Sequence, residues 1–304
     1  MKKFHLTILG SNAACPAYGR ITSCQILNYD ESLILIDCGE GCQIRLAEYK
    51  IKKSKIDIIC ISHLHGDHVF GLPGLVSSFS HEGRSKDLTI IGPLGIKQFV
   101  ESTLRLTHSR QTYKIEFIEL DHIGNLTLAQ KPMTISAFPL KHRVPTYGYR
   151  FDESLNERNI NKKAISTYNL TIEELKKLKK GIDVIRVDGQ IISYEEATLK
   201  QKPPRSFAYC SDTIYDEELI EYVKEVNFLY LETTYMHDLV DLAIERMHST
   251  STQSAMLAKK AGVGNLIIGH YSSRYRSVDD LWLEAKNTFN TTIKGYDGLL
   301  LDLN

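Results

Sequence analysis

Apolar residues in the first sixty positions occur in short runs separated by turn residues, a pattern that predicts β-strands. Strand-like and helix-like patterns then alternate along most of the remaining chain. Strands in both halves, with helices between them, predict packed layers of sheets and helices. Strands are predicted at 4–10, 24–29, 33–38, 56–62, 114–120, 133–140, 146–151, 206–210, 228–232, 265–268 and 298–303, and helices at 95–106, 216–226, 251–261 and 278–289.

One segment, at about 152–205, departs from this pattern because it is polar and a layered core does not need it. We interpret it as an arm inserted into a single domain that spans 1–304. The segment contains eleven Lys and Arg against nine Asp and Glu, so it is barely basic overall. Lysine runs on helices are often only solvated faces. The one concentrated basic patch consists of Lys176, Lys177, Lys179 and Lys180.

The composition narrows the class of protein. The chain has 304 residues, 37 basic and 37 acidic, and 42% of them are hydrophobic, which is typical of a globular protein. No apolar run reaches the roughly 18 residues that cross a membrane, and no secretory signal is expected, so we predict no membrane partner. Six scattered cysteines indicate reduced thiols and a cytoplasmic protein. Balanced charge argues against a generally basic nucleic-acid coat, so any RNA contact must be local.

The most informative stretch follows the predicted strand at 56–62 and reads His63-Leu64-His65-Gly66-Asp67-His68. Imidazole nitrogen and carboxylate oxygen are zinc ligands, with bonds of about 2.0–2.2 Å. We expect Gly66 to let the backbone turn sharply so that these side chains converge. Four candidate ligands on one short loop can hardly all serve one ion, so they suggest two adjacent metals. The alternative is a surface loop that is rich in histidine by chance.

Three later residues could complete such a site. His142, Asp212 and His270 each lie just beyond a predicted strand, where one edge of the sheets would gather them. Taken singly, each would more often be a hydrogen-bonded residue at a strand end. Together with the loop they form a two-metal set, in which Asp212 is the natural bridge because a carboxylate can offer one oxygen to each ion.

This ligand pattern resembles the metallo-β-lactamase superfamily. Further blocks are similar to those of one branch, the ribonuclease Z family of tRNA 3′-processing endonucleases in their short form. These blocks are His248-Ser249-Thr250 and His270-Tyr271-Ser272-Ser273-Arg274-Tyr275. The likeness covers essentially the whole chain. It implies an α/β four-layer fold, an αββα sandwich of two mixed β-sheets flanked by helices, in which the inserted arm grips tRNA.

The resemblance also implies how two zinc ions would be held. One ion would be held by His63, His65 and His142, the other by Asp67, His68 and His270, and Asp212 would bridge them. Asp67 would also orient the attacking water or take its proton.

A proton for the leaving oxygen needs an acid outside the metal set, and His248 fits because imidazole titrates near neutral pH. Glu232, at the end of the strand at 228–232, is a candidate to orient it; a strand-end salt bridge is the alternative. The implied partner is precursor tRNA, cut to leave a 3′-hydroxyl on the tRNA and a 5′-phosphate on the trailer, by a homodimer. The implied substrate contacts are Arg274 and the four arm lysines.

Two other classes of function remain open at this point. One is another hydrolase of the superfamily, such as a phosphodiesterase, lactonase or thioesterase, which would need much the same metal ligands. The other is a non-catalytic RNA- or protein-binding relative. Such a relative should have lost ligands, whereas all seven candidates are present here.

Overall fold

The computed structural model describes residues 3–121, 126–130, 133–154, 157–201 and 203–303. The chain divides into two compact units: a main body formed by Met1–Asp152 and Arg205–Asn304, and an arm formed by Glu153–Pro204. Each unit has a hydrophobic core of its own. Within the described residues, no helix has the length and hydrophobicity that a membrane-spanning segment needs.

The first sheet of the main body has the strand order β16-β1-β2-β3-β4-β5-β6. Strands β1 to β3 pair in antiparallel fashion, whereas β3 to β6 run parallel. Parallel strands place their carboxyl ends at the same edge of a sheet. The bounds are β1 Phe4–Gly10, β2 Cys24–Tyr29, β3 Ser32–Cys38, β4 Ile56–Cys60, β5 Leu88–Pro93, β6 Ile115–Leu120 and β16 Leu300–Asp302.

The second sheet has the order β15-β14-β13-β12-β9-β8-β7. Strands β12 to β15 run parallel, and β9 pairs with β12 in antiparallel fashion. The bounds are β7 Leu126–Gln130, β8 Met133–Leu140, β9 Thr146–Glu153, β12 Ser206–Cys210, β13 Phe228–Glu232, β14 Asn265–Gly269 and β15 Thr292–Lys294.

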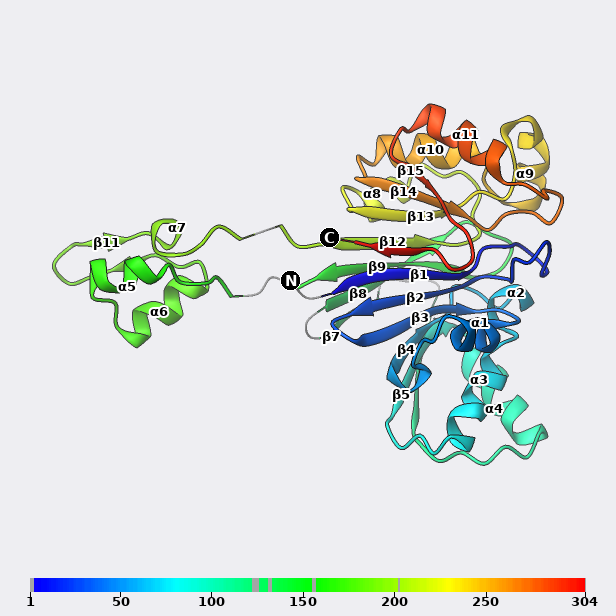
Figure 1. Ribbon diagram of the computed structural model, residues 1–304, viewed down its shortest axis with the longest axis horizontal. Helices are drawn as coiled ribbons and strands as arrows, with labels where there is room; N and C mark the ends of the chain where they lie inside the picture. The colour runs from blue at the N-terminus through cyan, green and yellow to red at the C-terminus, as the bar shows by residue number, and fades with distance from the viewer. Residues whose placement is uncertain (1–2, 122–125, 131–132, 155–156, 202, 304) are drawn as a thin grey trace. The chain divides into compact units, whose positions relative to one another are not determined.

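Helices cover the outer face of each sheet (Figure 1). Between the sheets lies a buried layer that includes Leu6, Ile8, Tyr149, Phe151 and Tyr209. The main body is therefore a four-layer αββα sandwich of two mixed sheets, and the predicted fold is confirmed. The helices on the first sheet are α1 Cys42–Glu48, η1 Lys53–Lys55, α2 Gly66–Val69, α3 Leu72–His81 and α4 Ile96–Leu106; those on the second are α8 Leu219–Val223, η2 His237–Leu239, α9 Val240–Arg246, α10 Ser251–Lys260 and α11 Asp279–Thr288.

Several elements differ from the prediction; α1, α9, β5, β7 and β15 were not predicted. Strand β5 ends in Gly92-Pro93, a pair typical of turns, although five of its six residues are buried. The helix predicted at 216–226 is shorter in the structure, where α8 spans Leu219–Val223. At its start, the side chain of Asp216 accepts the backbone N–H of Glu218 at 3.2 Å. Such a side-chain bond favours a turn over helix at this point.

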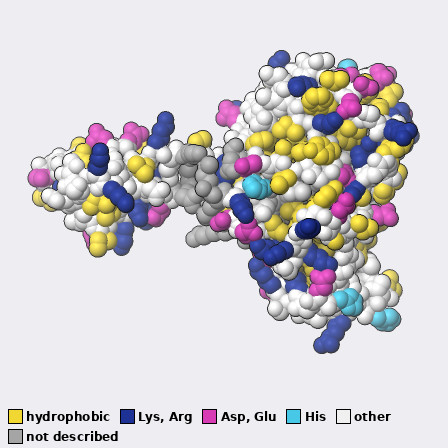
Figure 2. Space-filling view, viewed as in Figure 1, with side chains coloured by type: hydrophobic (Ala, Val, Ile, Leu, Met, Phe, Trp, Pro, Cys, Tyr) yellow, Lys and Arg dark blue, Asp and Glu magenta, His cyan; other side chains and the backbone are white. Residues whose placement is uncertain are grey.

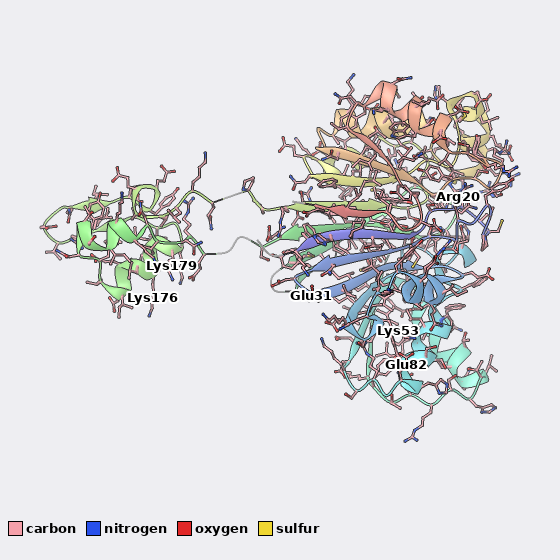
Figure 3. The ribbon with its side chains drawn as sticks, viewed as in Figure 1. Arg20, Glu31, Lys53, Glu82, Lys176 and Lys179 are labelled. Carbon is pink, nitrogen blue, oxygen red and sulfur yellow. The ribbon has the colours of Figure 1, made fainter. Side chains whose placement is uncertain are left out.

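The arm contains α5 Lys162–Tyr168, α6 Ile172–Lys179 and α7 Tyr194–Ala197, with a short antiparallel pair, β10 Val184–Ile185 and β11 Ile191–Ile192. Its core includes Leu178 and Val184. Lysine and arginine side chains lie among aspartate and glutamate on its visible face (Figure 2), which agrees with the nearly balanced charge. The four lysines of the predicted patch are exposed, and two of them, Lys176 and Lys179, project from α6 (Figure 3).

Candidate metal and catalytic site

Four of the predicted site residues of the main body follow strands, and these strand ends lie close together. His63 follows β4 of the first sheet, whereas His142, Asp212 and His270 follow β8, β12 and β14 of the second. His270 has a φ of 59°, in the left-handed region where histidine occurs more often than most residues other than glycine.

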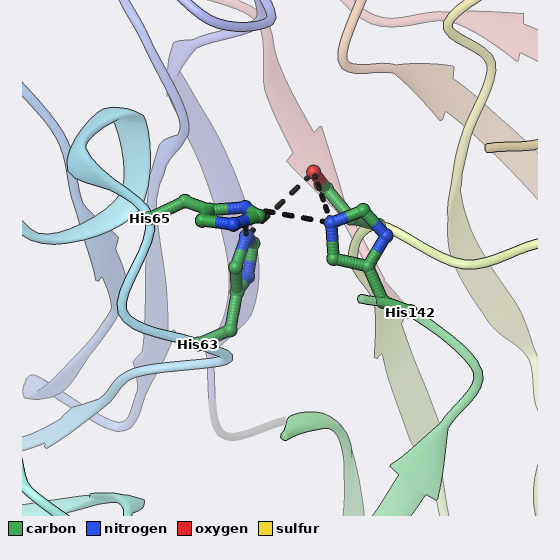
Figure 4. Close-up of side chains that lie close together, drawn as sticks. His63, His65 and His142 are labelled. Atoms are coloured by element: carbon green, nitrogen blue, oxygen red, sulfur yellow. Dashed lines mark hydrogen bonds and ion pairs between the residues drawn. The ribbon is translucent and has the colours of Figure 1, made fainter. Parts of the chain in front are cut away.

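His63, His65 and His142 form one group of imidazoles that converge on a point (Figure 4). Nδ1 of His65 lies 3.0 Å from Nε2 of His63 and 3.4 Å from Nε2 of His142. Together with a carboxylate oxygen of Asp212, their donor atoms all lie within 4.8 Å of one another. This spacing fits tetrahedral zinc, whose ligand atoms at about 2.0–2.1 Å from the ion stand roughly 3.4 Å apart.

Asp67, His68 and His270 form a second group. Nε2 of His68 lies 3.3 Å from Nε2 of His270 and 3.4 Å from Oδ2 of Asp67. The other ring nitrogen of His68, Nδ1, lies 2.8 Å from Oδ2 of the buried Asp37. A proton on Nδ1 leaves the lone pair of Nε2 directed into the group.

Asp212 lies between the two groups and is only 3% exposed. Its Oδ2 lies 3.7 Å from Nε2 of His63 and 3.8 Å from Nε2 of His142. Its Oδ1 lies 3.3 Å from Nε2 of His68 and 3.1 Å from Nε2 of His270. One oxygen thus faces each group, as a bridging carboxylate requires.

The first group has the protonation that metal ligands need. Burial lowers the pKa values of His63, His65 and His142 below the ordinary value for histidine. Neutral imidazoles keep a lone pair available for a metal at pH 7. In His142, Nδ1 also lies 2.9 Å from the carbonyl oxygen of Met247, so that Nε2 is the free nitrogen.

The second group has a surplus of negative charge. Burial acts to lower the pKa of His68, but surrounding carboxylates, Asp67 first, raise it well above its ordinary value. Burial acts to raise the pKa of Asp212, yet the imidazoles, His270 first, hold it well below the usual range. The carboxylates whose negative charge favours a proton on His68 would equally favour a metal cation in place of that proton. The donor set of the second group therefore fits a metal.

His248 and Glu232 form an ion pair beside the two groups. Nδ1 of His248 lies 2.8 Å from Oε1 of Glu232, which is fully buried and also accepts the backbone N–H of Thr213 at 2.9 Å. Burial acts to lower the pKa of His248, but the Glu232 carboxylate outweighs it and raises that pKa to about 9. His248 therefore carries a proton at neutral pH.

A cavity of about 260 Å³ opens beside these residues. Asp67, Asp212, His248 and His270 all line it. Arg274 is exposed, with its guanidinium 5.5 Å from the centre of the Tyr235 ring, which lines the same cavity. The structure thus brings the predicted metal and catalytic residues together at one opening. The four arm lysines belong to the other unit.

Two residues of this site were missed from the sequence. The carboxylate of Asp37 accepts hydrogen bonds from the backbone N–H of Ser62 at 2.7 Å and the hydroxyl of Tyr209 at 2.6 Å, besides contacting His68. The hydroxyl of Thr234 lies between Glu232 and His270. Asp37 could have been found from the sequence, because it lies near the end of a predicted strand, just as Asp212 lies directly after one. Thr234 had none beyond its closeness to Glu232.

Gly66 has a different role from the one expected. It begins α2 and is not among the glycines with positive φ, so the site needs no sharp turn there. A Cβ at this position would instead overlap the ring of Phe70. Phe70 is exposed, so its ring could move aside to make room.

Comparisons with known proteins match the chain to two family descriptions. Ribonuclease Z of Bacteroides fragilis is 36% identical over 304 residues, with all of both chains covered. The model of the family described as anti-Pycsar protein Apyc1 matches residues 4–288. Human tRNase Z, short form, has a TM-score of 0.71 at 23% identity over 99% of each chain.

A second solved structure, the metallo-β-lactamase fold protein YhfI from Bacillus subtilis, has a TM-score of 0.72 at 20% identity. The matched region covers 99% of this chain and 100% of the YhfI chain. At such identities the two structures establish the shared fold, whereas the full-length match to the Bacteroides enzyme establishes the family. The chain belongs to the ribonuclease Z family, the hydrolytic endoribonucleases of the metallo-β-lactamase superfamily, and to the family that the Apyc1 model describes.

Proposed function

We propose that this protein is a zinc-dependent endoribonuclease that cleaves precursor tRNA at its 3′ side. The products would be a 3′-hydroxyl on the tRNA and a 5′-phosphate on the trailer. The observation that carries the proposal is the placement of Asp212 between two ligand groups, one oxygen toward each. The names of the relatives, ribonuclease Z and tRNase Z, support RNA and tRNA as the substrate.

In this proposal each group would hold one zinc ion, and Asp212 would contribute to both sites. The ions would supply a hydroxide nucleophile at neutral pH and neutralise charge on the phosphoryl oxygens. The chain itself keeps the ligand nitrogens correctly aimed, since Met247 and Asp37 each accept the Nδ1 proton of a ligand imidazole. The ligands would be His63, His65 and His142 for one ion, and Asp67, His68 and His270 for the other.

Asp67 is placed to act on the attacking water. Its Oδ2 accepts the backbone N–H of Ala14 at 2.8 Å, a bond that fixes the carboxylate at the wall of the cavity. A carboxylate held in this way can direct a water molecule toward phosphorus or accept its proton.

His248 would protonate the departing 3′-oxygen. Its Nδ1 is occupied by Glu232, so Nε2–H is the proton available toward the cavity. The raised pKa keeps that proton in place at neutral pH until the leaving oxygen develops negative charge.

The arm and Arg274 would bind the RNA outside the reacting bond. Lys176, Lys177, Lys179 and Lys180 are exposed and can contact phosphates. Arg274 lies next to the rim of the cavity, where it can contact a phosphate close to the scissile bond.

Cytoplasmic location and a homodimer complete the proposal. All six cysteines are free and five are buried, which supports a reducing compartment. The dimer rests on the family resemblance. Light scattering on the purified protein would test it, because a mass near 34.5 kDa would rule it out.

Hydrolysis of a small phosphodiester is a second candidate function. The location of all the candidate catalytic residues in the main body favours considering it. A small substrate would not need the arm.

A cleavage assay separates the two functions. Purified protein with excess zinc would be given end-labelled precursor tRNA, a cyclic nucleotide, a lactone and a thioester. The proposal predicts one cut at the 3′ side of the tRNA with a 3′-hydroxyl on the upstream product. Turnover of the cyclic nucleotide with intact precursor tRNA would favour the second candidate.

A further inference from the structure

The hydroxyl of Thr234 connects the ion pair of His248 with the second ligand group. Thr234 follows β13 and is buried. Its Oγ1 lies 2.5 Å from Oε2 of Glu232 and 3.0 Å from Nδ1 of His270. Glu232 belongs to the ion pair with His248, whereas His270 belongs to the second ligand group.

Counting protons fixes the direction of these bonds. The hydroxyl has one proton and four atoms in reach that could accept it: Oε2 of Glu232 at 2.5 Å, Nδ1 of His270 at 3.0 Å, the carbonyl oxygen of His270 at 3.1 Å and Nδ1 of His248 at 3.4 Å. The carboxylate is the closest and strongest acceptor, so the proton goes to Glu232. The oxygen of the hydroxyl is then free to accept the Nδ1 proton of His270.

A proton on Nδ1 decides which nitrogen of His270 can bind a metal. In a neutral imidazole the lone pair is then on Nε2. That atom lies 3.1 Å from Oδ1 of Asp212 and 3.5 Å from Oδ2 of Asp67, inside the second ligand group. The opposite tautomer would direct an N–H into the group instead.

We propose that Thr234 is a positioning residue. It fixes the tautomer of His270 and, through Glu232, holds the imidazoles of His270 and His248 in a fixed orientation relative to each other. Its backbone N–H adds a bond of 3.2 Å to the same Oε2. The other oxygen, Oε1, accepts from His248. One hydroxyl and one carboxylate thus set the orientation of a ligand imidazole and of the acid together.

The neighbouring Thr233 provides a matched control. It is also buried, but its hydroxyl donates to the carbonyl oxygen of Leu231 at 3.3 Å. Thr233→Val and Thr234→Val remove the same atom from adjacent positions of the same segment. Thr234→Ser keeps the hydroxyl and removes only a methyl group.

The experiment measures zinc affinity by chelator competition, and kcat on precursor tRNA with excess zinc, for the parent and the three variants. We expect Thr234→Val to bind the zinc ion of the second ligand group about 10–100-fold less tightly than the parent and to have a lower kcat. Thr234→Ser should stay near the parent in both quantities, and Thr233→Val should keep the parent zinc affinity.

Parent-like zinc affinity in Thr234→Val, or an equal loss in Thr233→Val, would overturn the inference. Thermal unfolding of the variants shows whether a loss reflects the fold, since both valine variants remove one buried hydroxyl bond. The kcat measurement rests on the proposed function, whereas zinc affinity does not. If the parent left precursor tRNA intact, the zinc titration would still decide the role of Thr234.

Discussion

Nδ1 of His248 lies 2.8 Å from Oε1 of Glu232, although the two residues are 16 positions apart and belong to different elements. The carboxylate is fully buried, while the imidazole reaches the cavity. This pairing gives the site a protonated imidazole that the proposed ligand set does not use. Acid and metal functions can therefore be tested separately.

His248→Ala should retain zinc but lose turnover. Removing a general acid typically costs about 10²–10⁴-fold in rate, while the proposed ligand residues are unchanged. Zinc content by mass spectrometry and kcat on precursor tRNA would be measured together. His81→Ala serves as the control, because His81 is exposed at the end of α3. Cleavage by His248→Ala at the parent rate would assign the acid to another group.

Glu232→Gln should move the alkaline limb of the pH–rate profile. The Glu232 carboxylate raises the pKa of His248 to about 9, so the parent keeps its acid protonated up to that pH and loses activity above it. Without the carboxylate the pKa falls toward the ordinary value of about 6.5, and the loss begins at lower pH. A profile of kcat from pH 5 to pH 10 checks this. An unchanged alkaline limb would mean that His248 does not control it.

Asp37→Asn should reduce both stability and zinc affinity. The carboxylate accepts from Ser62, Tyr209 and Nδ1 of His68, and an amide can accept from fewer of these donors. A buried donor left unpaired costs about 1–3 kcal/mol in the free energy of unfolding. Denaturant unfolding would measure this cost.

The control for Asp37 is Glu82→Gln. Glu82 forms an exposed surface pair with Lys53 at 2.6 Å (Figure 3), and such pairs contribute only about 0–1 kcal/mol. Equal losses of unfolding free energy in the two variants would show that the hydrogen bonds of Asp37 stabilise the fold no more than a surface ion pair does.

The arm lysines can be tested in pairs of equal charge. Lys179 and Lys180 line a hollow of about 400 Å³ in the arm together with Arg158 and Tyr194, whereas Lys176 and Lys177 do not line it. We expect the double alanine variant of 179 and 180 to raise KM for precursor tRNA more than that of 176 and 177. The slope of its salt dependence should also fall by about one unit for each phosphate that the variant no longer binds.

Both pairs should leave turnover of a small phosphodiester unchanged, because no part of the candidate catalytic site lies in the arm. Equal effects of the two pairs on KM would indicate general charge rather than a local interaction. Substitution is preferable to deleting the helix, since Leu178 of α6 is in the arm core.

The sequence predicted those parts of the fold and site that follow from local pattern. Apolar runs that lead to His63, Asp212 or His270 mark strand ends, and parallel strands place such ends at one edge of each sheet, with His63 on the first sheet and Asp212 and His270 on the second. Strand β5 ends in Gly92-Pro93, a pair that is typical of turns and conceals the strand. The two-residue strands β10 and β11 are too short for any period to be detected.

Residues that act through distant partners could not be found in this way. Asp37 contacts Tyr209, which is 172 positions away, and Thr234 contacts His270 across 36 positions. The first contact depends on packing of the two sheets, and the second on the pairing of β13 with β14.

Asp212 and the six residues around it are proposed to hold two zinc ions that cleavage requires. The sharpest test is a titration of metal-free protein with zinc, in which bound zinc per subunit and the rate of precursor tRNA cleavage are followed together. The rate should rise to a plateau near two zinc ions per subunit, and Asp212→Asn should never reach that plateau. Cleavage at the full rate by the metal-free protein, or a plateau without bound zinc, would show that cleavage does not need the two zinc ions.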